Sequence, residues 1–296
     1  MTGQNDTKVA ITQAMINAYD EYTHLTLDRR GFMDKLTKLA GSGAAAAAIA
    51  PMLAANSAQA AMVEADDARI VGEEVSFEGA MGAVSGYLVK PAAQSGPLPG
   101  VIVIHENRGL NEHIRDVARR MALEGFVALA PDFLSDAGGT PGDEDKARAM
   151  IGELDGGQTV ENAVAAAGWL QARDDTTAKV GAIGFCWGGG LVNQLAVTSP
   201  ELAAAVPYYG RQPNTADVAK INAAVLAHYA GLDERINAGI EAYREALQAN
   251  GKDFTFHVYD GVNHAFNNDT SAARYDKAAA DLAWGRTVAF LKEKLG

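Results

Sequence analysis

The chain has 296 residues, of which 48% are hydrophobic and 21% charged, so it is long enough to bury one large core. Acidic residues outnumber basic ones by 37 to 25, and the net charge of −12 argues against a nucleic-acid partner because phosphates would be repelled. Cys186 is the only cysteine, which excludes an intrachain disulfide and a cysteine-based zinc site.

Residues 1–60 have the features of an export signal. They contain the run Arg29-Arg30-Gly31-Phe32, then an alanine-rich stretch over 39–55, and end in the small-residue pattern A-x-A at 58–60. This order resembles a twin-arginine signal, which predicts export by that machinery, cleavage near Ala61 and a periplasmic or secreted enzyme. A membrane anchor or a disordered tail is the alternative. Because the stretch is mostly alanine and glycine and contains a proline, it would insert poorly, and we expect no stable membrane anchor.

Residues 61–296 are expected to form one domain in which strands and helices alternate. Residues 73–90 predict a hairpin, and the unbroken β-branched run 101–104 predicts a strand buried on both faces. The remaining predicted strands cover 126–130, 180–185, 203–208, 223–230 and 254–259. The predicted helices cover 112–124, 143–172 with a break at 156–157, the segment after residue 187, 236–249 and 271–295. This alternation predicts an α/β fold with a mostly parallel sheet and helices on both faces.

The segment 184–188, G-F-C-W-G, has the pattern of a nucleophile elbow with Cys186 as the nucleophile. Glycines two residues before and two after the cysteine leave room for the strained turn. A sulfur at the start of a helix lies near backbone N–H groups that favour the thiolate. The alternative is a glycine-rich turn with a buried, inert cysteine.

Three further polar residues follow predicted strands. They are Glu106, Asp233 and His264, and in parallel sheets ligands bind at this carboxyl edge. The order nucleophile, acid, histidine is that of an α/β-hydrolase, with His264 as base and Asp233 as the residue that orients it. Taken singly, Asp233 could be a helix N-cap and His264 a surface histidine. The backbone N–H groups of Trp187 and Asn107 are the expected oxyanion donors.

These motifs together resemble the dienelactone hydrolase (carboxymethylenebutenolidase) family. The motifs are G-F-C-W-G-G, H-E-N-R-G-L after the first buried strand, P-Y-Y-G at 207–210, G-L-D at 231–233 and N-H-A-F at 263–266. The resemblance implies an α/β-hydrolase with the triad Cys186, His264 and Asp233. It also implies that Glu106 takes up the thiol proton, whereas from the residues alone Glu106 could form an ion pair with Arg108.

The resemblance also bears on the substrate. Founding members of the family carry a carboxylate-binding arginine four residues after the histidine, where this chain has Asn268. Arg148 or Arg211 could substitute, and Arg108 and Tyr209 are further substrate-binding candidates. We therefore expect neutral esters or lactones to be preferred over anionic ones.

The expected function is hydrolysis of a small ester or lactone through a thioester intermediate. No cofactor and no metal are expected, because the histidines lie on different segments without metal-binding spacing. The alternative function is a non-catalytic binding protein that retains the fold.

Overall fold

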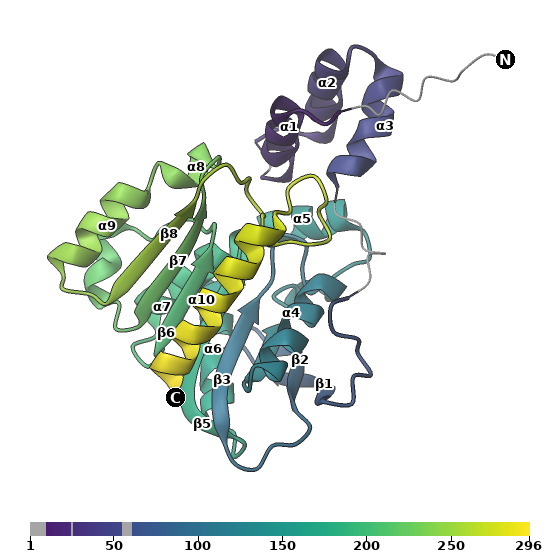
Figure 1. Cartoon of the computed structure of the whole chain (residues 1–296). Helices are drawn as coiled ribbons and strands as arrows, with labels where there is room; N and C mark the ends of the chain where they lie inside the picture. The colour runs from purple at the N-terminus through teal and green to yellow at the C-terminus, as the bar shows by residue number, and fades with distance from the viewer. Residues whose placement is uncertain (1–9, 25, 55–60) are drawn as a thin grey trace.

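The computed structural model describes residues 10–24, 26–54 and 61–296, and its centre is a sheet of eight strands (Figure 1). Strands β1 and β2 form the predicted antiparallel hairpin, β2 runs antiparallel to β4, and the strands from β4 to β8 are mutually parallel. Their spatial order is β1 (Ile70–Glu78), β2 (Ala83–Pro91), β4 (Val127–Pro131), β3 (Leu98–Ile104), β5 (Thr176–Phe185), β6 (Ala204–Tyr208), β7 (Ala224–Ala230) and β8 (Phe254–Tyr259).

Helices cover both faces of the sheet, which confirms the predicted fold class (Figure 1). Helices α4 and α10 pack on one face, and α6, α7 and α9 pack on the other. The helices that follow the first strands are α4 (Glu112–Leu123), α5 (Glu144–Gly152), α6 (Gly156–Gln171), α7 (Trp187–Thr198), α8 (Glu234–Asn237), α9 (Ile240–Ala249) and α10 (Lys277–Leu295), and short 3₁₀ turns lie at Ser135–Ala137 and Thr215–Lys220.

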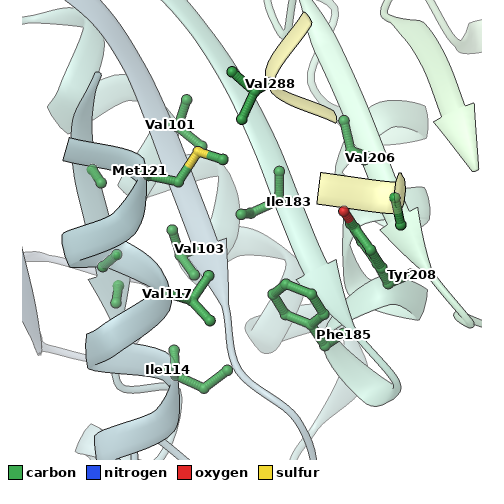
Figure 2. Packing of buried hydrophobic residues seen from close by; sticks show 14 of the residues in the cluster. Val101, Val103, Ile114, Val117, Met121, Ile183, Phe185, Val206, Tyr208 and Val288 are labelled. Atoms are coloured by element: carbon green, nitrogen blue, oxygen red, sulfur yellow. The ribbon is translucent and has the colours of Figure 1, made fainter. Parts of the chain in front are cut away.

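Strand β3 shows why the sheet needs both layers. Its side chains alternate between the faces, so Val101 and Val103 contact the α4 layer while Ile102 and Ile104 belong to the opposite core. Figure 2 shows Val101 next to Met121 and Val103 next to Val117, both on α4. All four strand residues are fully buried, and each such burial contributes about 1.5 to 3 kcal/mol.

Two helix predictions were wrong in detail. The helix expected over 236–249 is two helices, because α8 ends at Asn237 and α9 begins after Gly239. The last helix begins at Lys277 and not at 271, because the Asp276 side chain caps it by accepting the N–H of Ala279. The residues before Asp276 form turns at the carboxyl edge of the sheet.

The N-terminal segment folds into three helices, which the sequence analysis did not predict. They are α1 (Gln13–Thr23), α2 (Arg29–Ala40) and α3 (Gly43–Leu53). Side chains of Thr12, Asp28 and Ser42 cap them, and a separate small core joins them, built from Met15, Ile16, Ala18, Tyr19, Tyr22, Phe32, Leu36, Ala46, Ile49 and Leu53. Figure 1 shows these helices at the carboxyl ends of the parallel strands, near α5.

The expected membrane and cleavage features concern the same segment. Within the described residues no single helix is long and apolar enough to span a membrane; α2 and α3 together reach that length and composition, but they are bent by 113°. The A-x-A pattern at 58–60 lies outside the described residues.

Candidate active site

Cys186 lies at the turn between β5 and α7, as the elbow pattern predicts. Its φ of +56° is a conformation that side chains other than glycine rarely adopt, and its N–H donates to the Tyr208 carbonyl at 3.1 Å. A Cβ on Gly188 would lie 2.6 Å from the carbonyl oxygen of Ile104, and one on Gly184 would meet the backbone of Gly188. The turn therefore depends on both glycines of the motif.

Asp233 and His264 form the predicted pair at the neighbouring strand ends. Asp233 follows β7 and His264 follows β8, and His264 Nδ1 lies 2.5 Å from Asp233 Oδ2. Both residues are buried. The other carboxylate oxygen of Asp233 accepts the N–H of Ile236 at 3.2 Å, so Asp233 also caps α8. The aspartate thereby fixes one ring nitrogen of His264 and leaves Nε2 available for chemistry.

The charges around the sulfur favour a thiolate next to imidazolium. Burial acts to raise the pKa of Cys186, but the neighbouring His264 and His24 outweigh it and lower this pKa to about 6. Burial acts to lower the pKa of His264, but Cys186, Asp20 and Asp233 hold it well above the ordinary value. The pKa of Asp233 is lowered because His264 outweighs the effect of burial.

His24 is the site residue that the sequence analysis missed. It follows α1, and its Nε2 lies 3.4 Å from Cys186 Sγ. Its ring contacts that of His264 edge to face, with centroids 4.7 Å apart. The signal was a histidine just after an amphipathic stretch with aromatic residues at 19 and 22, within a segment interpreted as a leader.

The same three residues could also hold a metal ion, because His24 adds an imidazole to the site and the expectation of no metal concerned only the histidines after residue 60. One ligand atom from each of His24, Cys186 and His264 lies within 4.8 Å of the others. Imidazole and thiolate are ligands that zinc accepts. The elbow at Cys186 and the Asp233 partner of His264 are the arrangement of nucleophilic catalysis, which is the chemistry we develop below.

Glu106 has a different partner from those expected. Its Oε2 accepts the side-chain N–H of Asn268 at 2.6 Å, and its Oε1 has no partner among the described residues. Arg108 binds the Tyr19 hydroxyl at 2.9 Å and lies 3.4 Å from a Glu144 oxygen, and within the described chain it forms no ion pair with Glu106. The alternative of an Arg108–Glu106 ion pair was therefore wrong.

A cavity of about 920 Å³ opens at Cys186 and His264. Tyr209, Arg148 and Arg211 line it, as do the predicted oxyanion residues, Trp187 and Asn107. Trp187 is the first residue of α7, where backbone N–H groups have no acceptor within the helix.

Two predicted substrate-binding residues do not line this cavity. Asn268 is fully buried beside Glu106, because the turn formed by its N–H and the Ala265 carbonyl directs it away from the cavity. Arg108 is buried beneath Tyr19. Arg235, which the sequence analysis did not single out, lines the cavity instead.

Comparison with known proteins identifies the family of the chain. Residues 84–295 match the family model described as the dienelactone hydrolase family. A candidate carboxymethylenebutenolidase of Escherichia coli O157:H7 is 33% identical over 81% of this chain and 93% of its own. One from Saccharolobus solfataricus is 31% identical over 74% of this chain and 98% of its own.

Solved structures show the same likeness. The crystal structure of a candidate dienelactone hydrolase from Klebsiella pneumoniae is 31% identical, with a TM-score of 0.68, and the match covers 74% of this chain and 97% of that one. The fold is that of the α/β-hydrolases, and the relatives support a hydrolase of the ester or lactone type. The chain therefore belongs to the dienelactone hydrolase family.

Proposed function

We propose that this enzyme cleaves a small ester or lactone by nucleophilic attack of Cys186, with His264 and Asp233 completing a catalytic triad. The observation that carries the proposal is the position of Cys186 in a strained elbow near His264. Nδ1 of His264 lies 2.5 Å from the buried carboxylate of Asp233. A strained nucleophile beside an oriented base is what acyl transfer requires.

Acylation begins with attack of the Cys186 thiolate on the substrate carbonyl carbon. A C–S bond forms, and the carbonyl electron pair moves to the oxygen, where the N–H groups of Trp187 and Asn107 are the proposed donors. When the intermediate collapses, the C–O bond breaks and the leaving oxygen takes a proton from an imidazolium at the site. The product is a thioester on Cys186.

Deacylation needs a base for water. We assign this role to His264, because its Nδ1 faces Asp233 and its Nε2 has no hydrogen-bond partner among the described residues. Nε2 takes a proton from water, the resulting hydroxide attacks the thioester, and the C–S bond breaks to restore the thiolate. A lactone substrate is released as a single hydroxy acid.

The cavity suggests a substrate with an anionic group. Arg148 is engaged by Asp145 at 2.6 Å, whereas Arg211 and Arg235 line the cavity with no carboxylate within 4.0 Å among the described residues. The expectation of neutral substrates was based on Asn268, which lies outside the cavity. We therefore propose that Arg211 or Arg235 accepts a substrate carboxylate.

A substrate panel tests this function. Aryl esters, thioesters and lactones, each in a neutral and a carboxylate-bearing form, are assayed with the wild type and with Cys186→Ala. We expect the variant to lose about four orders of magnitude or more in kcat/KM. Arg211→Gln or Arg235→Gln should reduce turnover of the carboxylate-bearing members by about ten- to a hundredfold and leave the neutral ones. Activity retained in Cys186→Ala would refute the mechanism.

Export through the twin-arginine machinery, and with it a periplasmic location, stays a prediction that the pattern at 29–32 supports. The export prediction also includes cleavage near Ala61, which would remove α1, α2 and α3. It would thereby remove His24, the histidine beside the nucleophile. A fusion of residues 1–65 to a reporter, with Arg29→Lys and Arg30→Lys together as the control, tests export. The mass of the mature enzyme tests cleavage.

A further inference from the structure

His24 has the same kind of setting as the catalytic histidine of the proposed triad. Its Nε2 is the atom nearest the sulfur, at 3.4 Å, while Nδ1 lies 2.7 Å from the Asp20 carbonyl oxygen and 3.4 Å from the Asp20 carboxylate. A carbonyl oxygen can only accept, so Nδ1 carries the hydrogen. Neutral His24 therefore offers a lone pair to the thiol, and charged His24 offers an N–H to the thiolate.

The Cys186 sulfur thus lies near two imidazoles, and each of them contacts an aspartate. His24 contacts Asp20, and His264 contacts Asp233. The charged and titratable groups around His24 are Asp20 on its own helix, Cys186 before α7, His264 after β8, and Arg274, which lies 3.9 Å from Asp20. Burial acts to lower the pKa of His24, but Cys186 and Asp20 raise it above the ordinary value. A thiolate at Cys186 and the Asp20 carboxylate both favour the charged form of His24.

Contacts of the residues just before His24 fix its position against the catalytic domain. The side chain of Asn107 donates to the Thr23 carbonyl at 2.6 Å, and the Tyr22 hydroxyl donates to Asp145 at 2.6 Å. Arg108, only 3% exposed, donates to the Tyr19 hydroxyl. Removal of α1 would take this hydrogen-bond partner and the covering ring of Tyr19 away from Arg108.

Glu106, the residue expected to take the thiol proton, has one oxygen bound by Asn268 and the other without a partner among the described residues. Glu106 accepts from Asn268 and forms no hydrogen bond with Cys186 within the described residues, whereas His24 does. The match to the family model begins at residue 84, so α1 lies outside the residues that this model matches.

We propose that helices α1 to α3 are required for the activity of this enzyme and that His24 is a second catalytic imidazole. His24 takes the proton of the Cys186 thiol and holds the sulfur as a thiolate before substrate arrives. The inference rests on the proposed function. The S–H bond breaks and an N–H bond forms at Nε2 of His24. After C–S bond formation this imidazolium gives its proton to the leaving oxygen.

The two histidines then act in turn. In the acyl-enzyme the thiolate charge that raises the pKa of His264 is gone, so neutral His264 can take a proton from water. It is then left charged beside the restored thiolate. Transfer of one proton from His264 to His24 by way of the sulfur resets the site. Substrate and water are consumed, and an acid and an alcohol are released, which a lactone yields as one hydroxy acid, so protons and electron pairs balance.

The test compares full-length variants that begin at Met1. Because Cys186 is the only cysteine, iodoacetamide alkylation followed by mass reports on this thiol alone. We expect His24→Gln to raise the midpoint of the alkylation pH profile by about one unit, which is about a tenfold slower reaction at pH 5. We expect kcat/KM to fall by about ten- to a hundredfold. His257→Gln, a substitution on β8 away from the cavity, is the matched control and should change neither.

Chemical rescue separates catalysis from packing. His24→Gly, at a helix C-cap where glycine is tolerated, should regain activity when free imidazole is added, while His257→Gly should not respond. The inference is overturned if His24→Gln keeps the wild-type alkylation profile and kcat/KM, or if a mature chain without residues 1–60 has both. Activity retained in Cys186→Ala would instead refute the proposed function itself.

Discussion

Substitution of alanine at Gly188 should separate the elbow and β3 and weaken both stability and catalysis. The new Cβ would lie 2.6 Å from the carbonyl oxygen of Ile104 and would also meet that of His105. Side chains essentially never approach backbone this closely, since 3.0 Å is the practical limit, so the two segments must separate by at least 0.4 Å. Both are buried and closely packed, and strain of this kind costs about 1 to 3 kcal/mol.

Gly190 provides the matched control, two residues further along the same helix. A Cβ there has its nearest neighbour, the Arg211 nitrogen, at 3.6 Å, which is ordinary contact. Gly190→Ala should gain up to about 1 kcal/mol from helix propensity. Urea unfolding should therefore rank Gly190→Ala at or above the wild type and Gly188→Ala about 1 to 3 kcal/mol below it.

Catalysis should follow the same ranking. The end of β3 leads into Asn107, a proposed oxyanion donor, and small misplacements of such groups cost about tenfold or more. We expect kcat/KM on an aryl ester to fall in Gly188→Ala and to be retained in Gly190→Ala. Equal stability and equal activity of the two variants would refute the steric reasoning.

Three further predictions concern single contacts. Alkylation of Cys186 in the wild type should rise through a midpoint near pH 6, because its pKa is lowered from 9.0 to about 6 and only the thiolate reacts; a midpoint near 8.5 would contradict the ion pair. Asn268→Ala should lower the free energy of unfolding by about 1.5 to 3 kcal/mol, since buried Glu106 loses its donor, and urea denaturation with an unchanged midpoint would count against this. Tyr22→Phe removes the bond to Asp145 and should speed hydrogen exchange in α1 by about fivefold while the sheet is unaffected; unchanged exchange in α1 would mean that this bond does not hold the helix.

Much of the catalytic domain could be predicted because its signals are local. The run 101–104 is β-branched and apolar, and it forms a strand buried on both faces. Polar residues placed after such strands meet at one edge whatever their separation in the chain, which brings Asp233 within 2.5 Å of His264 across 31 residues.

The parts that could not be predicted depend on tertiary packing. Arg29 and Arg30 fit an export signal, and they equally fit the first turn of a helix capped by Asp28. Only the docking of α1 against Arg108 and Asn107 reveals that His24 reaches the sulfur. The position of Asn268 four residues after His264 likewise cannot show in which direction the turn points the Asn268 side chain.

The role of Asn268 illustrates that last point. Its position in the sequence suggested a residue in the substrate cavity, whereas the fold uses it to bind Glu106. Arg211 and Arg235, the cavity-lining cations without a carboxylate partner among the described residues, come from segments with no recognisable spacing to the triad. The position of Asn268 relative to the cavity is therefore what the sequence pattern predicted least well.

The claim that Cys186 is the nucleophile is tested most directly by trapping the acyl-enzyme. His264→Gln retains the thiol but lacks the base for water, so a rapidly quenched reaction with 4-nitrophenyl acetate should accumulate enzyme that is heavier by one acetyl group. Peptide mapping should place the group on Cys186, and Cys186→Ala should show none. An acetyl group on another residue, or full turnover by Cys186→Ala without any adduct, would contradict the mechanism.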